Sequence, residues 1–155
     1  MTIEHGTGNL LTVDADALVN TVNCEGVMGK GLALQFKKAF PEVFASYARA
    51  CKLGEVRPGK MHVVQRQTSP RVIINFPTKE QWRRPSRLEY VQGGLLDLCR
   101  TIQHLGIRSI AVPPLGCGNG GLAWSAVKPL IVEAFSGLPR VRVILFDPTE
   151  LPPMP

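Results

Sequence analysis

Two segments of this sequence run from a short buried strand through a glycine-rich loop into a helix, and this repeated order constrains the fold more than any other feature. In the first segment, the apolar residues 18–22 lead through three glycines into apolar residues at helical spacing. In the second, residues 109–112 lead through four glycines into a helix that begins near Trp124. Strands that are apolar on both faces are typical of parallel sheets covered by helices. The sequence therefore predicts an α/β fold.

The rest of the chain continues this alternation of strands and helices. Ser86 and Glu89 match the spacing of a capping box at the start of the most regular helix, and Gly106 ends it. Helices on both faces of a mixed, mostly parallel sheet form a three-layer α/β/α domain. We expect strands at residues 4–6, 18–22, 61–64, 72–76, 109–112 and 141–146, and helices at residues 32–36, 41–54, 88–105 and 124–135.

Length and composition limit the domain organisation. A chain of 155 residues that is 45% hydrophobic suffices for one domain with a substantial core and not for two. We expect this domain to cover residues 1–148, and the proline-rich residues 149–155 to be a tail or linker. The first residues lack the basic and apolar regions of a signal peptide, and no segment has the length of a membrane span. We therefore expect a soluble, cytoplasmic protein without a membrane partner.

The cysteines and histidines give no sign of a metal centre. The four cysteines are scattered without a C-x-x-C pair, and the three histidines are equally isolated. Structural zinc sites and disulfide frameworks have recognisable spacings that this chain lacks. We expect no metal, no cofactor and no disulfide framework.

Positive charge is concentrated in the middle of the chain. Residues 49–87 hold ten Lys or Arg and two Glu, whereas the net charge of the whole chain is +6. Such a basic sector favours a polyanionic partner, with nucleic acid as the first candidate. A solvated face of a soluble protein has the same composition, so charge alone leaves both interpretations open.

The second glycine loop is a candidate binding site for a diphosphate. Glycine allows backbone N–H groups to converge and phosphates to approach the chain, close to the positive end of a helix. The loop lacks both the Gly-Lys-Ser/Thr of a P-loop and the G-x-G-x-x-G of a dinucleotide fold. A turn without a ligand fits the same glycines. The presence of the other glycine loop favours a ligand. Both loops follow the carboxyl ends of strands, where ligands bind in α/β sheets.

Motifs in both loops resemble the macrodomain, an ADP-ribose-binding family, and the resemblance covers nearly the whole chain. They are Gly8-Asn-Leu-Leu11, Ala17-Leu-Val-Asn-Thr-Val-Asn23, Met28-Gly-Lys-Gly-Leu-Ala33 and Pro113-Pro-Leu-Gly-Cys-Gly118. Residues 28–31, 78–79 and 116–124 are similar to the terminal ADP-ribose glycohydrolase subclass and, within it, to macrodomains of the DarG type. DarG-type proteins are the antitoxins of DarT/DarG pairs. The toxin attaches ADP-ribose to thymidine in single-stranded DNA, and the antitoxin removes it.

The resemblance also implies the residues of the site. Lys79 matches the catalytic lysine of the subclass, and Asn23 is implied to contact the distal ribose and to orient catalysis. The residues implied to bind ADP-ribose are Gly8, Asn9, Leu10, Asn20, Gly29, Lys30, Gly31, Thr78, Leu115, Gly116, Cys117, Gly118, Asn119, Gly120, Gly121 and Pro148.

The chemistry of Lys79 and Asn23 agrees with these implied roles. A lysine attacks the anomeric carbon C1″ only as a neutral amine, so partial burial and the neighbouring cations Arg83 and Arg84 are expected to lower its pKa. The amide of Asn23 can both donate and accept hydrogen bonds to ribose or water. An exposed lysine without a catalytic role and an asparagine that only caps a turn are the alternatives.

Three other loop residues have alternative interpretations. Asn9 occupies the position where many macrodomains carry an Asp that reads the adenine amino group, and an amide oxygen accepts the same hydrogen bond more weakly. Asn20 lies nearer the strand interior and serves either the ligand or the loop. Cys117 has no histidine close in sequence, so we interpret it as a small structural residue rather than as a nucleophile.

A loop beside Lys79 combines an aromatic residue with cations. Trp82, Arg83, Arg84 and Arg87 have the side chains that hold single-stranded DNA, namely a ring that stacks on bases and cations that contact phosphates. A tryptophan that covers the edge of the core is the alternative. Trp124 is expected to belong to the core.

The resemblance implies a metal-free DNA ADP-ribosyl glycohydrolase. Its implied partners are ADP-ribosylated single-stranded DNA, ADP-ribose as product and a cognate DarT-type toxin. The alternatives are a non-catalytic ADP-ribose-binding module and a hydrolase of protein-linked or O-acetyl ADP-ribose. The protein-directed glycohydrolase of the subclass has a catalytic Asp in the second loop, whereas this chain has Asn119-Gly-Gly121 and no carboxylate there.

Overall fold

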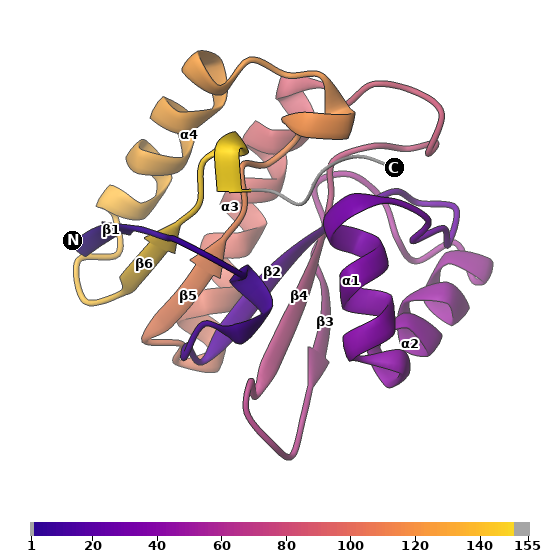
Figure 1. Ribbon diagram of the computed structural model, residues 1–155, viewed down its shortest axis with the longest axis horizontal. Coiled ribbons are helices and arrows are strands. Elements are labelled where there is room, and N and C mark those ends of the chain that lie inside the picture. The colour runs from indigo at the N-terminus through magenta and orange to yellow at the C-terminus, as the bar shows by residue number, and fades with distance from the viewer. Residues whose placement is uncertain (1, 151–155) are drawn as a thin grey trace.

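A computed structural model describes residues 2–150 and shows a six-stranded sheet between two layers of helices (Figure 1). The strand order is β1-β6-β5-β2-β4-β3, and every neighbouring pair is parallel except β3 with β4. The mixed, mostly parallel sheet is thereby confirmed. The strands are β1 (Thr2–His5), β2 (Ala17–Val22), β3 (His62–Gln65), β4 (Val72–Pro77), β5 (Ser109–Val112) and β6 (Arg142–Leu145).

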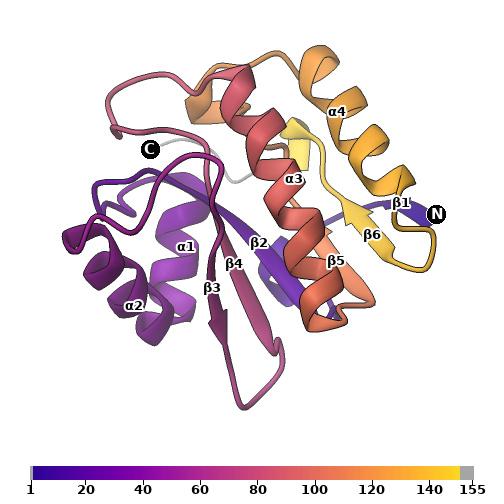
Figure 2. The same ribbon diagram turned by 180° about the vertical axis from the view of Figure 1, so that it is seen from behind.

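Four helices cover the two faces of the sheet. The helices α1 (Gly31–Ala39) and α2 (Pro41–Lys52) lie on one face, and α3 (Leu88–Leu105) and α4 (Trp124–Ser136) lie on the other, which is the nearer face in Figure 2. Alternate strand residues serve the two layers: Leu18 packs with the α1 layer, and Val19 packs with the α3 and α4 layer. This arrangement confirms the three-layer fold. None of the helices within residues 2–150 has the length and apolarity needed to cross a membrane.

Short 3₁₀ helices complete the described chain. They are η1 (Leu10–Thr12), η2 (Gly118–Gly120) and η3 (Pro148–Glu150). The last of these occupies the start of the expected proline-rich tail, and residues 151–155 of that tail lie outside the described residues. The boundary of the domain at residue 148 stays a prediction.

The capping box expected at the start of α3 is wrong. The N-cap residue is Arg87, and no side chain caps the helix. Ser86 is buried, its N–H donates to the backbone oxygen of Gly120 (2.9 Å), and its hydroxyl has no hydrogen-bond partner among the described residues. The carboxylate of Glu89 instead accepts from Arg87 (3.3 Å). Ser86 therefore packs against the second glycine loop and does not cap the helix.

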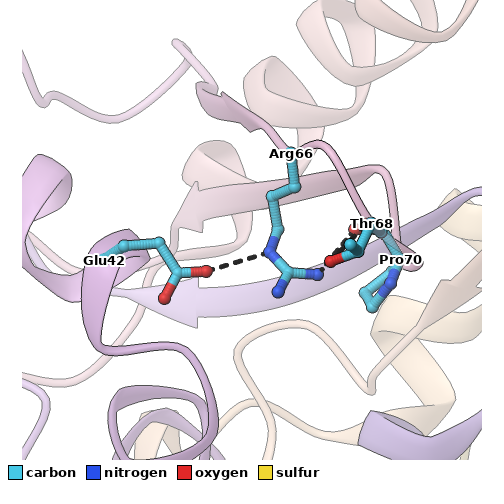
Figure 3. A network of polar contacts seen from close by, with 4 residues as sticks. All are labelled: Glu42, Arg66, Thr68 and Pro70. Atoms are coloured by element: carbon cyan, nitrogen blue, oxygen red, sulfur yellow. Dashed lines mark hydrogen bonds and ion pairs between the residues drawn. The ribbon is translucent and has the colours of Figure 1, made fainter.

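Arg66 connects the turn between β3 and β4 to helix α2 (Figure 3). Its Nε donates to Glu42 Oε1 (3.0 Å), and its Nη1 donates to the backbone oxygen of Pro70 (2.8 Å). Its guanidinium lies 4.6 Å from the centre of the Phe40 ring, and the side chain is only 15% exposed. Arg66, one cation of the basic sector, therefore stabilises the fold through these contacts.

Candidate active site

The sheet opens between β2 and β5, at the carboxyl ends of the strands. Strand β2 is paired with β4 over six residue pairs, from Ala17 to Val22. With β5 it shares only two pairs, Ala17 with Ile110 and Leu18 with Ala111. Beyond Leu18 the two strands separate, and the loops that follow them lie on either side of the opening. A crevice of this kind is where α/β sheets bind their ligands.

A cavity of about 1020 Å³ fills this opening. Segments that follow β2, β4, β5 and β6 all contribute to its wall, together with the first residues of α1. The volume is at the upper end of the range for pockets that bind small molecules, so it suits a ligand as large as a nucleotide sugar. The predicted residues that line it are Asn23, Gly29, Lys30, Gly31, Thr78, Lys79, Trp82, Arg83, Arg84, Gly116, Cys117, Gly118, Asn119, Gly120, Gly121 and Pro148.

The second glycine loop presents backbone to the cavity because side chains cannot be accommodated there. Gly116 has a φ of +74°, a conformation that L side chains rarely adopt, and a Cβ atom at this residue would lie 2.6 Å from Leu122. A Cβ at Gly120 would lie 2.3 Å from the Ser86 hydroxyl. Backbone hydrogen bonds from Cys117 to Pro114 (3.0 Å) and from Leu122 to Gly116 (2.9 Å) close the loop on itself. The loop is thus preorganised before any ligand enters.

Asn23 organises the first glycine loop from within. Its Oδ1 accepts from the N–H groups of Glu25 (3.0 Å) and Val27 (3.3 Å), and the Tyr47 hydroxyl lies 2.8 Å from the same oxygen. Its Nδ2 donates to the backbone oxygen of Val27 (2.8 Å). The amide oxygen therefore acts as a turn cap, which was the alternative interpretation. The second hydrogen on Nδ2 is the polar group that the internal bonds leave to a ligand.

Lys79 follows β4 and is one of the residues that line the cavity. The Nζ atom donates to the backbone oxygen of Trp82 (3.3 Å). Partial burial, and secondly the positive charge of Lys30, lower the pKa of Lys79 below its ordinary value. A larger fraction of neutral amine is therefore present near neutral pH than for a lysine in water.

The expected contribution of Arg83 and Arg84 to this pKa is wrong. The cation that lowers it is Lys30, which comes from the first glycine loop. The two arginines make other contacts: the guanidinium of Arg83 lies 4.7 Å from the Trp82 ring centre, and Arg84 Nε donates to Gln81 Oε1 (3.0 Å). Sequence proximity did not identify the charge that acts on Lys79.

Two exposed apolar side chains border the cavity. Val27 from the first glycine loop is 39% exposed, and Trp82 from the loop after β4 is 38% exposed. Both therefore offer apolar surface to a ligand in the cavity. The sequence interpretation missed Val27, and the neighbouring Met28, which is buried, shows that an apolar residue in this loop did not by itself mark an exposed position.

Six of the predicted site residues do not line the cavity, and their roles remain predictions. The Asn9 side chain accepts from the Leu11 N–H (3.0 Å) and so caps η1. Asn20 is fully buried, and its Nδ2 donates to Asn75 Oδ1 (3.2 Å). Arg87 is exposed and pairs with Glu89. The other three are Gly8, Leu10 and Leu115.

The environment of the cysteines does not favour thiol chemistry. Burial raises the pKa of Cys117 to about 11 and that of Cys24 to about 12. Both thiols are therefore protonated near neutral pH, which agrees with a packing role for Cys117. Within residues 2–150, no three His, Cys, Asp or Glu side chains lie close enough together to hold a metal ion.

Comparison with known proteins identifies the family. The chain matches the model of the Macro domain over residues 19–131. It is 56% identical over 149 residues to the DNA ADP-ribosyl glycohydrolase of Mycobacterium tuberculosis. The matched residues make up 95% of this chain and 42% of that protein. The chain thus spans about two fifths of the length of this curated relative. A Thermosipho africanus protein named as a fusion of a DNA ADP-ribosyl transferase and a DNA ADP-ribosyl glycohydrolase is 34% identical over 93% of this chain and 43% of its own length.

Solved structures agree with these sequence matches. The macrodomain of M. tuberculosis DarG superposes with a TM-score of 0.94 at 56% identity, over 95% of this chain and 98% of that one. DarTG of T. africanus in complex with ADP-ribose superposes with a TM-score of 0.86 at 35% identity, over 92% of this chain and 40% of that one. The chain therefore belongs to the macrodomain family and is similar over almost its whole length to the macrodomain of DarG.

Proposed function

We propose that this chain is the catalytic domain of a DNA ADP-ribosyl glycohydrolase that removes ADP-ribose from thymidine in single-stranded DNA. The observation that carries the proposal is that Lys79 lines one cavity together with residues of both glycine loops. The names of the M. tuberculosis and T. africanus relatives support the reaction. The biological role that we propose for the protein is that of an antitoxin. Its protein partner would then be a DNA ADP-ribosyltransferase of the DarT type.

The cavity suits the two phosphates of ADP-ribose. The first residues of α1 and the glycines of the second loop place backbone beside the opening, and Lys30 adds a positive charge. Backbone N–H groups at a helix start and in a glycine loop together form a site for an anion. The distal ribose then lies between Asn23, which follows β2, and Lys79, which follows β4.

The reaction breaks the bond between C1″ of ADP-ribose and the thymine ring nitrogen. The neutral amine of Lys79 attacks C1″, and the electron pair of the broken bond stays on the thymine nitrogen. The resulting imide anion is delocalised over two carbonyl groups, so it departs with little protonation. Water then attacks C1″, releases ADP-ribose and restores the amine. This route needs no carboxylic acid in the second loop, which agrees with the sequence Asn119-Gly-Gly121.

Direct hydrolysis is the other route, in which water attacks C1″ and Lys79 assists electrostatically. The covalent route forms a lysine adduct that opens to an iminium, and borohydride reduces this iminium to a stable amine. Mass spectrometry after reduction during turnover distinguishes the routes. An ADP-ribose mass on Lys79 indicates the covalent route, and full turnover without it indicates the direct one.

The test of the function compares substrates side by side. Release of ADP-ribose is measured from a thymidine-modified oligonucleotide and from ADP-ribosylated protein, with the wild-type chain and the variant Lys79→Ala. We expect turnover of the oligonucleotide, slower or no turnover of the protein, and loss of turnover in the variant with ADP-ribose binding retained. Binding without turnover would instead assign a non-catalytic module, and preference for modified protein would assign a different hydrolase.

A further inference from the structure

Glu25 connects the loop after β2 to the loop after β4. The carboxylate Oε1 of this exposed residue accepts from the N–H of Trp82 (2.8 Å). The backbone N–H of Glu25 in turn donates to Oδ1 of Asn23 (3.0 Å). The main chain of Glu25 is therefore bonded to the predicted catalytic residue Asn23. Its side chain is bonded to the loop that carries the other predicted catalytic residue, Lys79.

The backbone of Trp82 joins Glu25 to the Lys79 amine. Its N–H donates to the Glu25 carboxylate, and its own carbonyl oxygen accepts from Lys79 Nζ (3.3 Å). Because the amine bonds to this carbonyl, the position of the Trp82 backbone decides where the amine lies. A shift of that backbone moves the amine relative to C1″ of a bound substrate.

The other contacts between the two loops end before Trp82 and have backbone oxygens as acceptors. One of them runs from the Cys24 thiol to the backbone oxygen of Lys79 (3.4 Å). The N–H of Thr78 donates to the oxygen of Val22 (2.9 Å), and the N–H of Cys24 donates to the oxygen of Glu80 (3.0 Å). Of these contacts between the two loops, the Glu25 bond reaches farthest along the second loop, and it is the one made by a charged side chain. It acts on the part of the loop that is most exposed, since residues 80–85 are all exposed.

We propose that Glu25 is a positioning residue for the Lys79 amine, acting through the Trp82 backbone. This inference rests on the proposed glycohydrolase function. The property required of residue 25 is a hydrogen-bond acceptor at the end of a side chain of this length. Glutamine has such an acceptor, whereas alanine has none. The negative charge itself is not required.

The test compares three variants in the turnover assay and in ADP-ribose binding. In Glu25→Ala we expect kcat to fall at least about tenfold, since small displacements of a reacting group cost rate in this range. The Kd for ADP-ribose should stay unchanged, because Glu25 is not among the residues that line the cavity. Glu25→Gln should keep turnover within about twofold of wild type. Glu133→Ala, which removes an exposed glutamate of α4 outside the cavity, serves as the matched control.

A double-mutant cycle separates positioning from general destabilisation. If Glu25 acts through Lys79, then adding Glu25→Ala to Lys79→Ala lowers the residual rate no further. An equal loss in both backgrounds would overturn the inference, as would equal losses in Glu25→Gln and Glu25→Ala, since these would assign the effect to charge. Wild-type turnover in Glu25→Ala would also overturn it.

A readout without turnover keeps this inference distinct from the proposed function. Trp82 and Trp124 are the two tryptophans of the chain, so the variant Trp124→Phe leaves Trp82 as the single indole. In that background Glu25→Ala should increase quenching of Trp82 fluorescence by acrylamide, and Glu25→Gln should not. If fluorescence responds in this way while wild-type protein shows no turnover, the proposed function fails and the contact stands. Unchanged quenching in Glu25→Ala overturns the inference itself.

Discussion

The amine of Lys79 shares its cavity with a second amine, that of Lys30, and the two come from loops far apart in the sequence. Both groups are positively charged in water, so their proximity favours loss of a proton from one of them. Partial burial acts in the same direction on Lys79. A pair of lysines beside one cavity thus suits an anionic ligand and favours a neutral amine on Lys79.

The pH dependence of turnover tests this effect. The neutral amine predominates above the pKa of Lys79, which is lowered in the folded chain, so turnover should rise with pH and level off above that pKa. In Lys30→Met the second cause of the lowering is removed, so the pKa rises and the increase in rate moves to higher pH. Lys37→Met, which changes an exposed lysine of α1 outside the cavity, should leave the profile in place. A profile that does not move in Lys30→Met contradicts the coupling.

The hydroxyl of Tyr47 supports Asn23 from the core. It lies 2.8 Å from both the backbone oxygen and Oδ1 of Asn23, and the Tyr47 side chain is fully buried. Tyr47→Phe should lower the free energy of unfolding by about 1 to 2 kcal/mol, because the buried Asn23 acceptors lose a donor. Tyr90→Phe removes a hydrogen bond to Glu80 (2.7 Å) nearer the surface and should cost less. Urea denaturation measures both, and equal costs would argue against a supporting role for Tyr47.

At the scale of elements, the close approach of α3 to the sheet depends on one glycine. A Cβ atom at Gly94 would lie 2.3 Å from the Phe76 ring of β4, whereas one at Gly93 would meet its nearest atom at 3.9 Å. Gly94→Ala should therefore destabilise the fold by about 1 to 3 kcal/mol through overpacking. Gly93→Ala should stabilise it by up to about 1 kcal/mol, because alanine favours the helix. Chemical denaturation with an unchanged m-value checks the pair, and equal effects would contradict the packing argument.

Elements with local signals were predicted from the sequence, and contacts between distant loops were not. The apolar runs of β2 and β5 identified buried strands, and Gly106 identified the end of α3. The capping box failed because Ser86 contacts Gly120, a residue far along the chain. The cation acting on Lys79 was misassigned for the same reason, since Lys30 comes near it only when β2 and β4 pair. The two glycine loops were located because glycine marks a loop locally, whereas the individual cavity residues came from the family resemblance.

The loop after β4 should act on DNA more than on ADP-ribose. Trp82 is exposed at the cavity rim beside Arg83, an arrangement that suits stacking on a base next to the modified thymidine. Trp82→Ala should raise the KM for a modified oligonucleotide by the equivalent of about 1 to 3 kcal/mol of binding free energy. It should leave ADP-ribose binding nearly unchanged. Trp124→Phe, a change in a partly buried residue of α4, is the control. Equal losses for both ligands would contradict a DNA role for Trp82.

At the scale of the whole molecule, positive charge should make DNA recognition depend on salt. The net charge is +6, and Arg83 and Arg84 lie at the cavity. The logarithm of oligonucleotide affinity should fall with the logarithm of salt concentration, by about 0.7 for each phosphate contacted. Replacing both arginines by glutamine should reduce the slope by about 1.4 if each contacts one phosphate. Free ADP-ribose is the comparison ligand, and an unchanged slope would exclude these arginines from DNA contact.

The separation of β2 from β5 beyond two residue pairs has a mechanical consequence. The part of the sheet that carries β4 and β3 and the part that carries β6 and β1 are joined there by little backbone pairing. A nucleotide sugar that contacts the loops of both parts therefore acts as a cross-link between them. Amide protons of the central strands should exchange with solvent more slowly in the complex, although the ligand touches only the ends of those strands.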